Sequence, residues 1–128
     1  MPIEIKYIEN NSGVILDYSG YVSGDELVSV VNEIFNNDNF TSLKYWIADR
    51  TNCTKYDVET HHAKAIAALT EMHYLKNPNM LLALVSPKNI EFGMSRMYQI
   101  LSDDKGFKTM VFHSRSEANE WISNELNI

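Results

Sequence analysis

The feature that most constrains the fold is a short apolar segment, residues 80–85 (MLLALV), which follows the helix-breaking residues 77–79 (NPN). It has no polar residue at alternate positions, as expected for a β-strand that the rest of the chain covers on both faces. Such strands occur in sheets whose parallel members are joined by helices packed against the sheet. We therefore expect an α/β fold in which residues 80–85 form a strand away from the sheet edge.

The beginning of the chain has the pattern of a β-hairpin followed by a helix. Residues 3–7 alternate between apolar and polar positions, and the turn-forming residues 10–13 (NNSG) separate them from a second strand at residues 14–21. Ser23 and Glu26 have the spacing of a capping box, in which the serine hydroxyl accepts an amide hydrogen bond at the start of a helix. The sequence therefore predicts an antiparallel hairpin and then an amphipathic helix.

The remaining elements alternate between strands and helices. In order, we expect a strand at residues 45–49, a polar loop at 50–55, a helix from a cap at Thr54 or Asp57 to about Leu75, the strand at 80–85, a helix from 86–89 to about 101, a strand at 108–112 and a closing helix from 114–116. Right-handed crossovers make the helix-linked strands parallel, and the hairpin adds one antiparallel pair. The order β-β-α-β-α-β-α-β-α therefore predicts a mixed five-stranded sheet with helices packed against it, in a single domain over residues 1–128.

Composition excludes several classes of protein. The net charge of −6 argues against nucleic-acid binding, which needs clustered lysines and arginines. The one cysteine, Cys53, excludes an internal disulfide framework and is typical of a reducing cytoplasm. No apolar run approaches the roughly 18 residues of a membrane span, and the polar start is not a signal peptide. We therefore expect a cytoplasmic protein that is not an integral membrane protein.

Two segments give the chain a family resemblance. The chain resembles the SpoIIAA-like group of STAS-type domains, also labelled STAS/SEC14-like. The resemblance rests on the element order, on residues 92–98 (FGMSRMY), and on residues 111–112 (VF) followed by 117–122 (EANEWI). The resemblance covers nearly the whole chain and implies the STAS fold; the STAS domains include the bacterial anti-sigma-factor antagonists. Antagonists of that kind carry a phosphorylatable hydroxyl in an Asp-Ser-Ser/Thr-Gly motif after the third strand. Asp49 matches the motif's aspartate and Thr51 is the nearest hydroxyl, so the resemblance implies Thr51 as a possible phospho-acceptor, although the adjacent serine and the glycine are absent.

Charged residues gather on the loops expected beyond the carboxyl ends of the parallel strands, where ligands of open α/β sheets bind. Helix N-termini at that edge favour anions, so an anionic ligand or a phosphorylated partner is one interpretation. The other is ordinary surface charge, since lysines also decorate the opposite edge. The residues of this possible ligand or partner loop are Asp49, Arg50, Thr51, Lys55, Lys88 and Arg115.

The histidines and the cysteine suggest no reactive centre. His62 and His73 are eleven residues apart on one predicted helix, roughly 16 Å at the usual rise, so they cannot share a metal ion. We expect His62 to be a half-buried, hydrogen-bonded packing residue, and we expect no metal and no cofactor. Cys53 lacks the surroundings of a known nucleophile, and Asp49 is better placed to brace its loop than to transfer protons.

Methionine and aromatic side chains at helical spacing allow an apolar pocket as well as plain core packing. The pocket candidates are Trp46, Phe92, Met94, Met97 and Tyr98, and Met72, Met80 and Met110 are expected at the core or its margin.

The sequence leaves three functions open. The leading one is a non-enzymatic module that binds a protein partner or a second copy of itself. The alternative is a carrier or sensor of a small apolar or amphipathic, lipid-like ligand, suggested by the SEC14-like label. An enzyme using Asp49 or Cys53 comes third.

Overall fold

One mixed sheet of five strands organises the chain. The computed structural model describes residues 2–87 and 106–128. In that part the strands are β1 (Ile3–Ile8), β2 (Gly13–Ser23), β3 (Tyr45–Asp57), β4 (Leu81–Val85) and β5 (Lys108–Phe112), and they lie side by side in chain order. β1 is antiparallel to β2, and the other pairs are parallel. The predicted mixed sheet is confirmed, and β4 lies inside it between β3 and β5.

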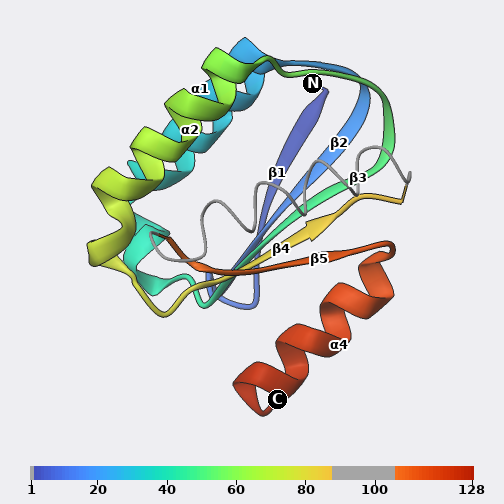
Figure 1. Cartoon of the computed structure of the whole chain (residues 1–128). Helices are drawn as coiled ribbons and strands as arrows, with labels where there is room; N and C mark the ends of the chain where they lie inside the picture. Colours follow the sequence, from blue (N-terminus) through green and yellow to red (C-terminus); the bar gives the residue numbers. More distant parts are fainter. Residues whose placement is uncertain (1, 88–105) are drawn as a thin grey trace.

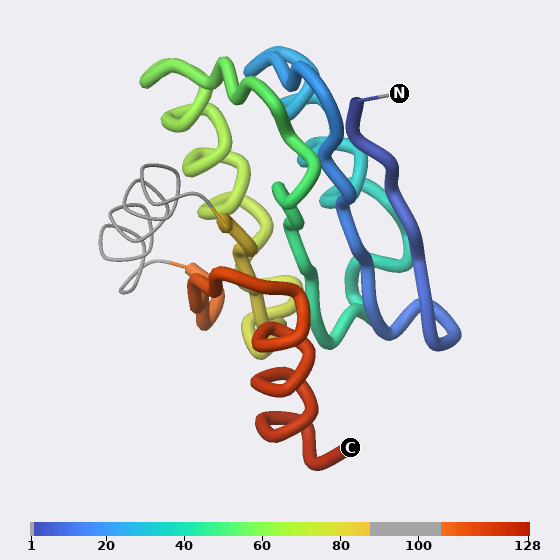
Figure 2. Tube along the Cα trace, turned by 90° about the vertical axis from the view of Figure 1, so that its right-hand side faces the viewer, coloured from blue at the N-terminus to red at the C-terminus, as the bar shows by residue number. Residues whose placement is uncertain are grey.

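The helices form layers on the two faces of the sheet. α1 (Gly24–Phe35) and α2 (Thr60–His73) lie next to each other on one face, and α4 (Arg115–Leu126) covers the other (Figure 1 and Figure 2). Short 3₁₀ helices, η1 (Asp38–Ser42) and η2 (Tyr74–Lys76), follow α1 and α2. The helix that we predicted to begin at residues 86–89 and end near residue 101 lies outside the described residues.

The hairpin turn and the first helix form for the predicted local reasons. Asn10 and Asn11 adopt positive φ angles of 58° and 64°, a conformation that asparagine tolerates well. The Ser23 hydroxyl accepts the amide hydrogen of Glu26 at 3.2 Å and thereby caps α1. A Cβ at Gly13 would overlap the outer end of the Tyr45 ring, so a larger residue there would displace that ring.

Two apolar clusters hold the layers together. Between the sheet and α4, the buried side chains of Leu81, Ala83 and Val85 pack with Ala118 and Ile122. On the other face, an aromatic group packs around Phe35 of α1, whose ring lies 5.5 Å from that of Trp46 and 4.9 Å from that of His73. This second cluster also contains Met80, which is buried as predicted.

The end of β3 differs from the prediction. The polar residues 50–55, expected to form a loop, continue the strand as far as Asp57. The reason is pairing: β2 runs on to Ser23 and supplies parallel backbone partners for this segment, with register shifts on either side of Gly20.

The longer strand also moves the start of the next helix. The N-cap of α2 is Glu59, not Thr54 or Asp57. The prediction for Met72 is wrong too, because its side chain is 71% exposed on the outer side of α2, whereas Met110 is partly buried.

Candidate functional site

The polar segment of β3 divides between the two faces of the sheet. Successive side chains of a strand point to opposite faces, so Asp49 faces α4 while Arg50 faces the α1–α2 layer. The predicted loop site is therefore not assembled as one group. Lys55 lies apart from both, with Nζ 5.7 Å from the ring centroid of Tyr21, and Lys88 lies outside the described residues.

On the α4 face, Asp49 is the centre of a small polar network. One carboxylate oxygen, Oδ2, accepts a hydrogen bond from Nη1 of Arg115 at 2.8 Å. The other, Oδ1, accepts from the hydroxyl of Thr51 at 2.5 Å and from its backbone amide at 2.9 Å. Arg115 also donates to Asp17 at 3.2 Å, and so links β2, β3 and the first turn of α4. The structure thus brings together Asp49, Thr51 and Arg115, in a bracing arrangement rather than an open anion site.

The opposite face contains a cavity of about 370 Å³ between β2–β4 and the α1–α2 layer. The residues that line it are mostly apolar: Tyr18, Leu27, Val31, Phe35, Trp46, Ala48, Arg50, Tyr56, Val58, Glu59, Thr60, Ala63, Ile66, Thr70, Leu82, Leu84 and Phe107. Of the predicted pocket residues, Trp46 lines this cavity. The other four, Phe92, Met94, Met97 and Tyr98, lie outside the described residues.

Arg50 is the charged residue of the cavity wall that comes from the sheet. It is only 7% exposed, and its guanidinium carbon lies 4.0 Å from the ring centroid of Tyr56. The Tyr56 ring in turn stacks on that of Tyr18, with centroids 6.4 Å apart and planes inclined by 13°. The cation is thereby held against an aromatic face, a favourable arrangement for a desolvated guanidinium.

The first turn of α2 closes one end of the cavity and is fixed by His62. Its Nδ1 accepts the amide hydrogen of Glu59 at 3.1 Å, so Nε2 carries the proton and donates to Asp25 of α1 at 3.0 Å. The side chain is mostly buried and hydrogen-bonded, which confirms the packing role predicted for it. Across residues 2–87 and 106–128, no group of three His, Cys, Asp or Glu side chains has the geometry to hold a metal ion.

Of the residues that line the cavity, the sequence singled out Trp46 as a pocket residue and Arg50 as part of the charged loop. Tyr56, Ala63 and Phe107 are among those that it missed. Tyr56 was missed because the polar pattern of its segment is typical of a loop, and Phe107 because it directly precedes the last strand. The spacing of Trp46, Ala48 and Arg50 could have indicated that all three face the same side of the sheet, because side chains two residues apart in a strand lie on one face.

Comparison with known proteins identifies the fold. No family model matches the sequence, and no curated protein matches it. Among solved structures, one similar to this chain is an uncharacterised protein of the DUF3478 family with a SpoIIAA-like fold from Shewanella loihica PV-4. Its TM-score is 0.58 at 11% identity, over 94% of this chain and 91% of that one.

A second similar structure is that of the anti-sigma factor antagonist SpoIIAA in its unphosphorylated form. The TM-score is 0.53 at 12% identity, over 94% of this chain and 96% of that one. The chain therefore has the SpoIIAA-like fold that the sequence motifs predicted. In the part of the chain that the structure describes, no helix combines the length and apolar character needed to cross a membrane.

Proposed function

We propose that this chain is a non-enzymatic regulatory module that acts by binding a protein partner. The observation that carries the proposal is the SpoIIAA-like fold over 94% of the chain, because a protein with that fold is an anti-sigma factor antagonist. The surroundings of Asp49 and Cys53, the two residues considered for catalysis, agree with a binding role. The Asp49 carboxylate is engaged by Arg115 and Thr51, and the Cys53 thiol is buried.

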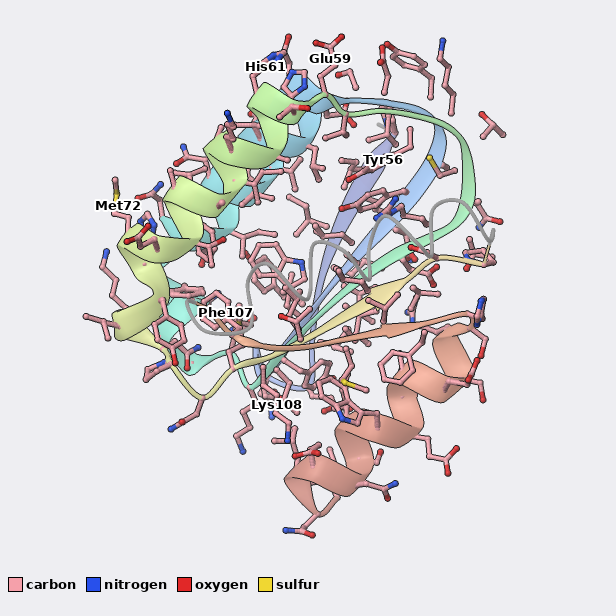
Figure 3. All side chains as sticks on the ribbon, in the orientation of Figure 1. Tyr56, Glu59, His61, Met72, Phe107 and Lys108 are labelled. Carbon is pink, nitrogen blue, oxygen red and sulfur yellow. The ribbon has the colours of Figure 1, made fainter. Side chains whose placement is uncertain are left out.

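The surface that we assign to the partner is the groove between the outer sides of α1 and α2. It is lined by Asp25, Val28, Ser29, Asn32, Ala65, Ala68, Leu69 and Met72. Figure 3 shows Met72 pointing away from the sheet on the outer side of α2. Small side chains at Ser29, Ala65 and Ala68 let another backbone approach closely, and Leu69 and Met72 offer apolar contacts. The occupant we propose is an amphipathic helix of the partner, with basic residues near Asp25.

Partner capture with two neighbouring alanine variants tests this assignment. Ala68→Glu places a charge in the groove, whereas Ala67→Glu places the same charge on the exposed surface of the same helix beside it. We expect cross-linking in the native host to capture the same partner with the unmodified protein and with Ala67→Glu, but not with Ala68→Glu. No captured partner, together with a monomer in sedimentation, contradicts the proposed function. Equal capture by both variants contradicts the groove.

Phosphorylation of Thr51 by a protein kinase is the regulatory input that we propose for this module. Its side chain is exposed, and its hydroxyl is held by Asp49 next to Arg115. A phosphate would replace that hydrogen bond with nearly two negative charges and draw Arg115 away from Asp17 and Asp49. The intact mass of the protein from its native cells tests this. We expect one added phosphate that is absent from Thr51→Ala, and an unmodified mass under all growth conditions contradicts it.

A further inference from the structure

The strand β1 forms the edge of the sheet opposite β5. In the part of the chain that the structure describes, β1 pairs with β2 alone, and Figure 2 shows it along the outer side of the sheet. An edge strand presents unpaired backbone N–H and C=O groups, which are a ready template for another strand. The free side of β1 is therefore a surface to which a further strand can be added.

The backbone groups on the free side of β1 belong to Ile3, Ile5 and Tyr7. The amide of Ser19 donates to the carbonyl of Pro2 at 2.7 Å, and the register of β1 and β2 places these two residues opposite each other. Hydrogen-bonded and non-hydrogen-bonded pairs alternate along an antiparallel ladder, so the even-numbered residues of β1 bond to β2 and the odd-numbered ones point outward. Pro2 faces β2, and its missing N–H therefore removes no donor from the free side.

The side chains of β1 differ between the two faces of the sheet. Ile3, Ile5 and Tyr7 pack in the cluster beneath α1, and the last two are only half-buried. Glu4 and Lys6 alternate with them on the other face, where their side chains are 64% and 48% exposed. Two exposed charges of opposite sign therefore lie on either side of Ile5.

These charges select one register for a second copy of the same strand. Two antiparallel copies pair about a two-fold axis, and their outward backbone groups match when the axis passes through a residue. An axis at Glu4 or Lys6 places like charges directly opposite each other, which is unfavourable. An axis at Ile5 places Glu4 of each copy opposite Lys6 of the other and pairs the strand over its full length.

We propose that two copies of this chain associate through β1, antiparallel and centred on Ile5, so that their sheets form one continuous sheet. Ile3 pairs with Tyr7 of the other copy and Ile5 with its own counterpart, and each such pair exchanges two backbone hydrogen bonds. The Glu4–Lys6 pairs set the register more than they add affinity. A two-fold axis perpendicular to the sheet keeps α1 and α2 of both copies on the same side, so the dimer presents both partner grooves on one face.

Sedimentation equilibrium with charge variants tests the dimer and its register. We expect the parent protein to dimerise weakly, because the edge of one strand buries less surface than a standard interface. Glu4→Lys places lysine opposite lysine at both contacts and raises the dissociation constant about tenfold or more. Lys6→Glu does the same with glutamates. The matched control, Glu120→Lys, makes the same charge change on the exposed surface of α4 and leaves the dimer intact.

Recombining the charges separates the proposed pairing from a general effect of net charge. An equimolar mixture of Glu4→Lys and Lys6→Glu associates again, because each strand then meets two opposite charges. The double variant, in which positions 4 and 6 exchange their charges, also dimerises, and it decides the register if Lys6→Glu alone does not fold. A monomer at about 1 mM protein, a dimer that Glu4→Lys leaves unchanged, an equal loss with Glu120→Lys, or no recovery in the mixture or the double variant each overturns the proposal. Partner capture by the groove does not involve β1, so these results leave the proposed function to its own test.

Discussion

Replacing Gly24 by alanine tests the contact that joins α1 to α2. Gly24 is the first residue of α1, and a Cβ at this position would overlap Nδ1 and Cγ of the His62 ring. The φ angle of Gly24 lies outside the left-handed region, so alanine meets no backbone strain. The cost of the substitution therefore arises from the imidazole alone.

The expected magnitude follows from two opposing effects. Overpacking of this kind costs about 1–3 kcal/mol, while replacing glycine by alanine in a helix gains up to about 1 kcal/mol. We expect Gly24→Ala alone to lower the free energy of unfolding by about 1–2 kcal/mol. His62→Ala alone loses the hydrogen bond from the Glu59 amide and the hydrogen bond to the exposed Asp25, together about 1 kcal/mol. When His62 is already alanine, Gly24→Ala becomes neutral or stabilising, which gives a coupling of about 2 kcal/mol.

Urea denaturation of the two single variants, the double variant and the parent measures that coupling. Gly20 provides a matched control, because it has a φ of +62° and no atom lies within 4 Å of the position that a Cβ would take. Gly20→Ala is destabilised by its backbone conformation alone, so its cost stays the same whether or not His62 is present. Additive effects of Gly24→Ala and His62→Ala, within about 0.5 kcal/mol, would refute the steric explanation.

Three further predictions concern Tyr45, Arg115 and Cys53. Burial, together with the charge and hydrogen bond of a nearby glutamate, raises the pKa of Tyr45 to about 12. The stability that this shift contributes is complete below pH 10 and is lost as the pH rises to about 12, by up to about 2–3 kcal/mol. We expect urea titrations between pH 10 and 12 to show a smaller loss of unfolding free energy for Tyr45→Phe than for the parent protein. An equal loss with pH in both proteins would contradict this prediction. Arg115→Met leaves the Asp49 side chain, 8% exposed, without its cation and costs about 2–4 kcal/mol, part of which Asp49→Asn restores. A double variant no more stable than Arg115→Met would count against this pairing. Cys53 is buried, so a thiol reagent labels it only as the protein unfolds, and rapid labelling in native buffer would show an accessible thiol.

The sheet was predictable because local patterns and pairing partners agree in most of the chain. The asparagine-rich turn, the Ser23 cap and the apolar segment at 80–85 each specify one structure, and all three are found. The second half of β3 was not predictable from its own residues. Its polar side chains carry no strand pattern, and the segment is extended because the far end of β2 offers it backbone hydrogen bonds.

The sequence predicted that Asp49, Arg50 and Arg115 lie in one group, whereas the structure places them on two faces of the sheet. A loop at residues 50–55 would group Asp49, Arg50 and Arg115 at one edge. In a strand the same neighbours point to opposite faces, so Asp49 pairs with Arg115 and Arg50 enters the cavity. Because the prediction ended β3 too early, it placed the Asp49–Arg115 network and the cavity residue Arg50 in a single site.

The sequence of α2 explains both the cavity and the exposed Met72. Within this helix, all of which the structure describes, His73 alone is buried. The helix is fixed at its two ends: His62 bonds to Asp25 at the first turn, and His73 stacks on Phe35 at the last. Four of the ten residues between them are alanines, and one of these, Ala63, lines the cavity. The apolar side chains of α2 therefore divide between the cavity, which Ile66 lines, and the outer groove, which Leu69 and Met72 line. Helical spacing alone did not separate these two sides, and the prediction therefore placed Met72 at the core or its margin.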